Sequence, residues 1–142
     1  NTVARHTYDN IKATGFYTIN HVHEALIADA HHTAAKYPKT ISEFDQTALT
    51  AVYQAGFPAP YVAEAVVQLG LKFLQEVPIE VNGTILMLGE IQEIRLPAAL
   101  VGAAGMVDLN AAKTVTITGL DSNHLPQLLE RFGYARPKPL ED

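Results

Sequence analysis

The sequence has no cysteine, no run of basic residues and no long apolar stretch. The absence of cysteine excludes disulfides, thiolate zinc sites and a cysteine nucleophile, and it fits a reducing compartment. Ten Lys and Arg against fifteen Asp and Glu give a formal net charge of −5. Because the cations are spread along the chain, we do not expect nucleic acid as a partner. No stretch approaches the roughly 18 apolar residues that span a bilayer, so we expect no membrane association and a cytoplasmic protein.

The common catalytic motifs are missing too. The two serines, Ser42 and Ser122, stand neither in a G-x-S-x-G pattern nor beside an obvious base. The glycines form neither a G-x-x-x-x-G-K-[ST] loop nor a G-x-G-x-x-G turn, so nucleotide binding by those routes is not supported. Glu43 and Asp45 fit a helix start, where acidic residues stabilise the dipole without a catalytic task. No side chain is therefore predicted to act as a catalytic acid, base or nucleophile, and none as a metal ligand.

The composition predicts one domain over residues 1–142, because 48% of the chain is apolar and that is enough for a single core. The first half has the spacing and capping residues of short helices. We expect a first helix over 7–14, with Thr7 as N-cap and Gly15 at its end, followed by a strand over 15–20. A second helix is expected over 22–37, where Pro38 stops it, and a third over 43–52, where Ser42 caps it. A loop is expected at 56–60, because two prolines interrupt the chain there.

The second half changes to the alternating period of strands. We expect a strand over 67–73, a hairpin turn at Asn82-Gly83, a return strand over 84–96 with a bulge near Glu93-Ile94, a surface loop over 97–105, a strand over 113–118, and a closing helix over 124–132. This order predicts an α+β chain with a mainly β core, built around an antiparallel meander.

Arg5, His6 and Thr7 open the first predicted helix. Free backbone N–H groups, the positive end of the helix dipole, a hydroxyl and a guanidinium would meet there, and these are the groups that bind phosphate. The alternative is an ordinary capped helix with solvated neighbours.

The histidines offer a second interpretation. His21 and His23 could share a strand face, and His31 and His32 lie about two turns along the next helix, so imidazole ligands for a metal are conceivable. Against this, adjacent helical residues point about 100° apart, and no H-E-x-x-H motif occurs. We therefore favour solvated or structural histidines.

Several segments resemble the flavin reductase-like proteins, which bind FMN in a split β-barrel. The opening "ARHTYDNIKATGFYTINHV" resembles their R-x-D-T-x-x-N-I-x-x-x-G-x-F-x-x-N segment, and "AAKYPKTISEFDQTAL" resembles their Y-P-x-x-x-x-E-F segment. "APYVAEAVVQLGLKFLQEVPI", "TILMLGEIQEI" and the tail "HLPQLLERFGYARP" resemble the later strands and the final tyrosine-containing stretch. The matches run in order through nearly the whole chain.

The resemblance implies an antiparallel split β-barrel with short peripheral helices, and a homodimeric flavoprotein that passes electrons from NADH or NADPH to flavin. It implies FMN as cofactor, with Arg5, His6 and Thr7 at its phosphate and Asn20 near it, and it allows a partner oxygenase that receives reduced flavin. Because the cofactor performs the hydride chemistry, no catalytic side chain is needed.

The chain departs from the family pattern in two ways. His6 stands where the family has an aspartate, which removes a negative charge beside the proposed phosphate. The family's opening strands, which line the flavin ring, have no counterpart, so we expect the natural protein to carry residues before Asn1. Three alternatives stay open: a non-catalytic flavin- or ligand-binding protein, a histidine-based metal enzyme, and a dimerisation domain without a ligand.

Overall fold

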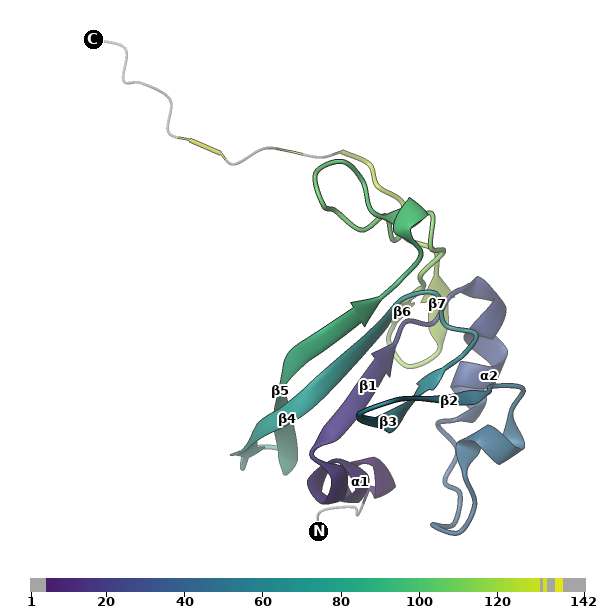
Figure 1. The fold of residues 1–142 in the computed structure, drawn as a ribbon, viewed down its shortest axis with the longest axis vertical. Helices are drawn as coiled ribbons and strands as arrows, with labels where there is room; N and C mark the ends of the chain where they lie inside the picture. The colour runs from purple at the N-terminus through teal and green to yellow at the C-terminus, as the bar shows by residue number, and fades with distance from the viewer. Residues whose placement is uncertain (1–4, 131, 133–134, 137–142) are drawn as a thin grey trace.

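The computed structural model describes residues 5–130, 132, 135 and 136. Its centre is an antiparallel sheet in the order β1-β4-β5, formed by β1 (Phe16–Asn20), β4 (Gln68–Ile79) and β5 (Thr84–Arg95). Figure 1 shows these strands side by side, with helix α1 (His6–Thr14) at one end and helix α2 (Ile27–His32) to the side. The predicted antiparallel architecture with short peripheral helices is confirmed.

Two bulges bend the long hairpin of β4 and β5. Gly70 pairs with Glu93 but Leu71 pairs with Ile91, so Gln92 is an extra residue in β5. The bulge predicted near Glu93 is confirmed, and it restores the apolar phase of the strand. A second bulge leaves Leu74 as the extra residue in β4. The hairpin closes over residues 80–83, where Gly83 has a φ of 66°, so only one residue of the predicted Asn82-Gly83 turn is left-handed.

A second hairpin, β2 (Ala51–Gln54) and β3 (Phe57–Val62), packs across one face of the central sheet. The prediction of a loop at 56–60 is wrong, since Pro58 and Pro60 both lie within β3. Proline is tolerated in a strand that has a ladder partner on one side only, and β3 pairs only with β2. The other side of β3 is tied to β1 through side chains: the Thr18 hydroxyl donates to the Pro60 carbonyl at 2.6 Å, and the Val62 N–H donates to Asn20 at 3.1 Å.

The crossing of β3 over the sheet encloses the largest fully buried side chain among the described residues. Tyr61 is completely buried, with 0% of its surface exposed, and its hydroxyl donates to Glu93. Arg95 lies over the Tyr61 ring, 4.9 Å from its centroid. A Cβ atom at Gly70 would stand 2.1 Å from the Tyr61 hydroxyl. The glycine therefore leaves the space that the tyrosine fills.

The helical segments are shorter than predicted. The helix expected over 22–37 is a 3-10 turn, η1 (Glu24–Leu26), followed by α2 (Ile27–His32). The helix expected over 43–52 is only a 3-10 turn, η2 (Glu43–Gln46), and β2 begins at Ala51. The Ser42 side chain does cap η2, accepting from the Phe44 N–H at 3.3 Å. Short segments gain little from helix propensity, so their ends follow from packing.

After β5 the chain makes a 3-10 turn, η3 (Ala98–Leu100), and a small hairpin of β6 (Thr116–Thr118) and β7 (Ser122–His124). The loop predicted over 97–105 is partly wrong, because η3 buries Leu100 against Val67 and Ala112. The predicted strand over 113–118 shortens to β6. The closing helix predicted over 124–132 is wrong: His124 ends β7, and residues 125–130 and 132 have no regular structure.

Candidate functional site

Helix α1 begins without a side-chain cap. Its N-cap residue is Arg5, with extended backbone angles, and Thr7 is already the second helical residue. The prediction of Thr7 as N-cap is therefore wrong. The first helical bond runs from the Asp9 N–H to the Arg5 carbonyl at 3.2 Å. The N–H groups of His6, Thr7 and Tyr8 thus have no partner within the helix, and they remain available to an anion or to water.

Arg5, His6 and Thr7 form one wall of a cavity of about 480 Å³. The opposite wall is the segment 33–37, which follows α2, together with Glu43 at the start of η2. The exposed ion pair between Lys39 and Asp9, at 3.3 Å, links the helix to the chain just beyond that segment. The structure therefore places Arg5, His6 and Thr7 together at an open hollow between two segments that are distant in the sequence, and their role at a phosphate stays a prediction.

The second wall of this cavity was not predicted from the sequence, and it includes Thr33, Lys36, Tyr37 and Glu43. A signal was present, because Tyr37 and Glu43 are the tyrosine and glutamate of the Y-P-x-x-x-x-E-F pattern. Lys36 adds a second cation and Glu43 one carboxylate, whereas the Thr33 hydroxyl already donates to the Ala30 carbonyl at 2.7 Å. The donors outnumber the acceptor, and the helix dipole adds to the positive side.

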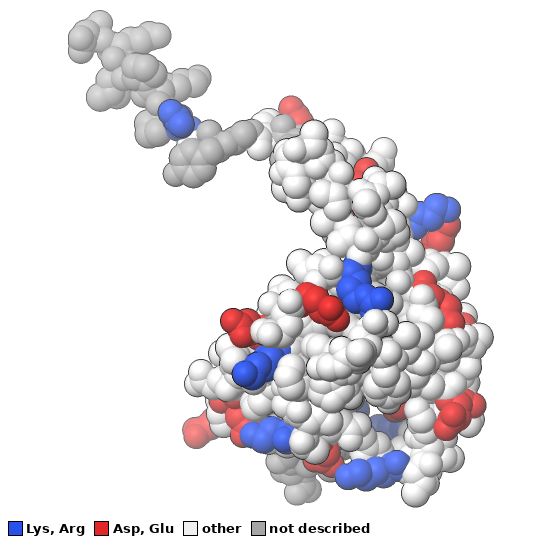
Figure 2. Space-filling model, viewed as in Figure 1, with Lys and Arg blue, Asp and Glu red and all other residues white. Residues whose placement is uncertain are grey.

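The face seen in Figure 2 carries acidic and basic side chains interspersed, without a large patch of one sign. This agrees with the even spread of cations in the sequence. In the wall of the cavity at the start of α1, Arg5 and Lys36 outnumber the single carboxylate of Glu43, and this small local excess of positive charge suits a small anion more than a polyanion.

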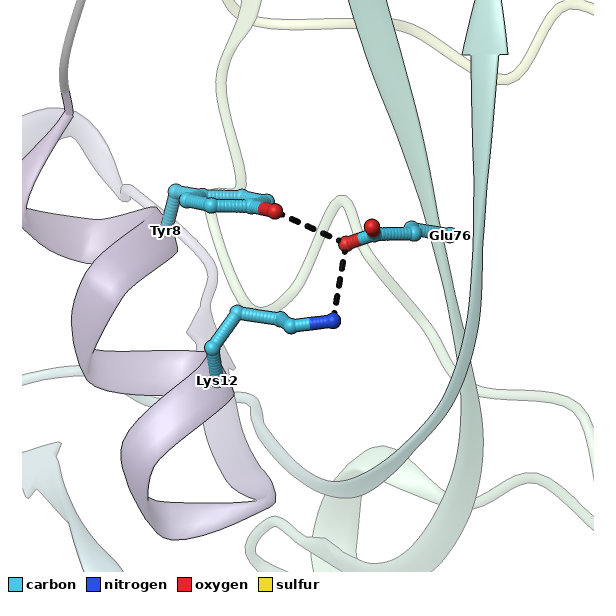
Figure 3. A network of polar contacts seen from close by, with 3 residues as sticks. All are labelled: Tyr8, Lys12 and Glu76. Carbon is cyan, nitrogen blue, oxygen red and sulfur yellow. Dashed lines mark hydrogen bonds and ion pairs between the residues drawn. The ribbon is translucent and has the colours of Figure 1, made fainter.

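Helix α1 is held on the sheet by a three-residue network, which Figure 3 shows from close by. The Tyr8 hydroxyl and the Lys12 ammonium both donate to the same carboxylate oxygen of Glu76 on β4, each at 3.0 Å. The hydrogen bond to Lys12, with a smaller contribution from Tyr8, lowers the pKa of Glu76. The hydrogen bond to Glu76, with some burial, raises the pKa of Tyr8. At neutral pH the network therefore keeps a charged acceptor and a protonated donor.

Asn20 does not line this cavity. Its amide nitrogen donates to Thr18 at 3.0 Å and its oxygen accepts from the Val62 N–H at 3.1 Å. The side chain thereby joins β1 to β3 at the far end of β1 from the helix. A role for Asn20 beside a cofactor stays a prediction.

The histidines do not assemble into a metal centre. The His23 ring is held by the Glu64 carbonyl at 3.0 Å and by the Ala25 N–H. His21 and His31 line a second, mainly apolar cavity of about 480 Å³ between α2 and the β6–β7 hairpin, where His21 Nδ1 is buried without a partner. Among the residues that the structure describes, no group of three or more His, Asp or Glu could hold a metal. The same residues include no helix that is long and apolar enough to cross a membrane.

Comparisons with known proteins agree on one family. The sequence model of the flavin reductase-like domain matches residues 2–115. A structure from Shewanella frigidimarina, a split barrel protein provisionally described as a flavin reductase, is 40% identical, with a TM-score of 0.89 over 92% of this chain. The chain spans 66% of the length of that protein. No curated protein matches the sequence.

Two more distant structures share the fold. Component B of nitrilotriacetate monooxygenase from Bacillus cereus is 20% identical, with a TM-score of 0.79 over 94% of this chain and 66% of its own length. The flavoredoxin of Desulfovibrio vulgaris (Miyazaki F) is 21% identical, with a TM-score of 0.77 over 92% of this chain and 70% of its own length. At these identities the likeness establishes the split-barrel fold.

Proposed function

The chain belongs to the flavin reductase-like family, and from that premise we propose that it binds FMN and passes electrons from NADH or NADPH to flavin. One observation carries the FMN proposal. Two sequence segments that each resemble the family, one containing Thr7 and the other Tyr37 and Glu43, meet at one cavity beside an uncapped helix start. We extend the proposal to the whole of residues 1–142 as one flavin reductase-like domain.

The residues around the cavity fit a phosphate monoester. Arg5 and Lys36 supply positive charge, Thr7 supplies a hydroxyl, and the first turn of α1 supplies N–H groups with no partner in the helix. When the T and the N of the family's R-x-D-T-x-x-N pattern are placed on Thr7 and Asn10, its arginine falls at position 4, which is Ala4 in this chain. Arg5 therefore offers its guanidinium from the adjacent position, and His6 in place of the aspartate avoids repulsion of the phosphate.

When bound, FMN supplies the two-electron chemistry of its ring, so the tasks of the protein are to bind, orient and shield it. Arg5 and Lys36 hold the charged end, and the fixed N–H groups of His6 and Thr7 set its position without further ordering. Because the cofactor supplies the chemistry and the protein supplies the binding, the sequence needs no motif for a catalytic acid, base or nucleophile. We further propose that an oxygenase can receive the reduced flavin.

The phosphate proposal is tested by titrating FMN into the purified protein while following quenching of flavin fluorescence. We expect Arg5→Ala to weaken FMN binding by about 1.5–3 kcal/mol, the contribution of a hydrogen bond to a charged group. Riboflavin, which lacks the phosphate, should bind the variant and the parent protein equally. Lys72→Met removes a cation from an exposed position of β4 outside the cavity and should leave both affinities unchanged. An unaltered FMN affinity in Arg5→Ala would remove Arg5 from the site.

The electron-transfer proposal has its own test. Consumption of NADH or NADPH should accelerate when free FMN is added to the protein. A protein that binds FMN but oxidises neither nicotinamide would instead favour the non-catalytic flavin-binding alternative. Elemental analysis addresses the metal alternative, because a stoichiometric transition metal is not expected of a flavin reductase-like protein.

We also propose a homodimer, supported by an apolar surface on the β4–β5 hairpin. Within residues 5–130, β1 pairs with residues 68–72 of β4, and no third strand pairs with the outer half of the hairpin. One face of this outer half carries Val77, Ile79, Leu86 and Leu88, whose exposed fractions are 37%, 36%, 48% and 40%. Burial of such a surface against a second copy lowers the free energy. Leu86→Lys should reduce the mass measured by light scattering to that of one chain, whereas Leu120→Lys, at a position that is 92% exposed and lies outside this surface between β6 and β7, should not.

A further inference from the structure

We propose that Glu76 is a positioning residue for the phosphate site, because it sets the angle at which the start of α1 faces the cavity. The inference rests on the proposed binding of FMN at that helix start. Glu76 is on β4, does not line the cavity and has no counterpart in the segments that resemble the family's phosphate site. It acts only through the helix.

The geometry explains why the start of α1 needs such a contact. The far end of the helix is fixed to the sheet, because Gly15 ends it in a left-handed conformation and the Gly15 carbonyl accepts from the Phe73 N–H at 2.8 Å. A helix of nine residues is about 13 Å long, so a rotation of about 5° at Gly15 would move its start by about 1 Å. Binding groups must be held within about 0.5 Å to act together. The hinge at Gly15 alone does not provide that precision.

Glu76 supplies a restraint from the side, in addition to the buried Ile11 and the exposed Lys39–Asp9 ion pair. Tyr8 and Lys12 are four residues apart, so they lie on one face of α1, and both donate to one oxygen of Glu76 (Figure 3). Lys12 also lies over the Phe73 ring, 5.1 Å from its centroid. Tyr8 matters most, because its own backbone N–H is one of the three donors at the helix start that have no partner in the helix. Fixing its side chain therefore fixes the turn of helix that directly follows His6 and Thr7, which line the cavity.

The direction in which Glu76→Gln changes the affinity for FMN distinguishes a positioning role of Glu76 from a purely electrostatic one. Glu76→Gln removes one negative charge, and by charge alone that change should strengthen the binding of an anion. If Glu76 acts by positioning, the same substitution should weaken FMN binding. Because Gln has the shape of Glu but makes weaker, uncharged hydrogen bonds with Tyr8 and Lys12, it loosens the network with little change in packing.

The experiment compares FMN with riboflavin, which differs from it only in lacking the phosphate. Dissociation constants for both are measured by fluorescence quenching on purified parent protein, Glu76→Gln and Glu80→Gln. Glu80 is exposed in the turn of the same hairpin and serves as the charge-matched control. We expect the FMN dissociation constant to rise about tenfold in Glu76→Gln, the riboflavin constant to change less than twofold, and Glu80→Gln to match the parent.

A change confined to protein stability would alter the amount of folded protein but not the ratio of the two dissociation constants, so the ratio is the decisive quantity. An unchanged or increased preference for FMN in Glu76→Gln overturns the role of Glu76 while leaving FMN binding intact. A parent protein that binds FMN no better than riboflavin overturns the phosphate site and the role of Glu76 together. If Glu76→Gln does not fold, Tyr8→Phe removes a single hydroxyl and should lower the same ratio, with Tyr53→Phe on the exposed strand β2 as its control.

Discussion

Two tyrosine–glutamate pairs connect distant parts of this chain, and they differ chiefly in burial. Tyr61 on β3 donates to Glu93 on β5 inside the molecule, with no part of its surface exposed. Tyr8 on α1 donates to Glu76 on β4 near the surface, where Lys12 shares the same acceptor. Burial is the main cause of the raised pKa of Tyr61, whereas the hydrogen bond to Glu76 is the main cause for Tyr8.

The difference separates what holds the fold from what prepares a site. Around Tyr61 the neighbouring groups are satisfied and the space is full, so a ligand has no access. Around the start of α1 the helix amides have no partner in the helix, and an open cavity lies beside them. Substitutions at the first pair should therefore change stability, and substitutions around the cavity should change the binding of FMN.

The largest effect is expected at Tyr61. Tyr61→Ala should lower the free energy of unfolding by about 3–5 kcal/mol, because it removes a completely buried aromatic ring. Urea denaturation followed by circular dichroism measures this change. Tyr53→Ala, at a tyrosine with 65% of its surface exposed, should stay within about 0.5 kcal/mol of the parent. Equal effects at the two positions would contradict the assignment of Tyr61 to the core.

Gly70 tests the same region from the opposite side. Gly70→Ala should cost about 1–3 kcal/mol of stability, since the new methyl group would collide with the Tyr61 hydroxyl and the Phe57 ring. Gly102→Ala is the matched control, because a Cβ there meets only the Met106 carbonyl oxygen at an ordinary 3.6 Å. A Gly70→Ala protein as stable as the parent in urea would mean that β3 does not press on the sheet.

Alkaline pH should distinguish the two tyrosines. The pKa of Tyr61 is raised in the folded protein, so its stabilising contribution is complete below about pH 10 and declines as the pH rises above that value, where the unfolded chain ionises first. The loss has a maximal slope of about 1.4 kcal/mol per pH unit for one proton. Tyr61→Phe should flatten the pH dependence of unfolding more than Tyr8→Phe does. The reverse order would contradict the difference in burial.

The smallest effect is expected at the rim of the cavity. Lys36→Met should weaken FMN binding by about 0.3–1 kcal/mol, the usual contribution of an exposed charge, and leave the urea midpoint unchanged. Riboflavin binding should not respond. A loss of stability without a loss of FMN affinity would place Lys36 in the fold rather than in the site.

The strand predictions succeeded where a local pattern coincided with the packing. The apolar–polar alternation around Leu69 and Leu71 and the phase change near Glu93 predicted the central hairpin and its bulge. The prediction failed for β3, because the prolines at 58 and 60 indicated a loop. A proline can lie in a strand where no neighbouring strand needs a hydrogen bond from its backbone nitrogen. The local sequence does not specify whether such a neighbour is present.

Only part of the candidate site could be predicted, because the local sequence does not specify which distant segments come together. Arg5, His6 and Thr7 are adjacent in the chain, so the sequence alone could indicate the start of α1 as a candidate for anion binding. Lys36 and Glu43 reach the same cavity only through the path of the chain after α2. Glu76 is 68 residues from Tyr8, and no periodicity in the sequence links them.

The amino-acid sequence by itself determined the family, the antiparallel character of the sheet and the helix start that offers free amides, because each of these depends on residues near one another in the chain. The tertiary structure alone decided which distant segments face that helix start, which glutamate restrains it and which tyrosine is sealed in the core. Those outcomes depend on the closing of long loops, whose cost is recovered only when the whole set of contacts forms together.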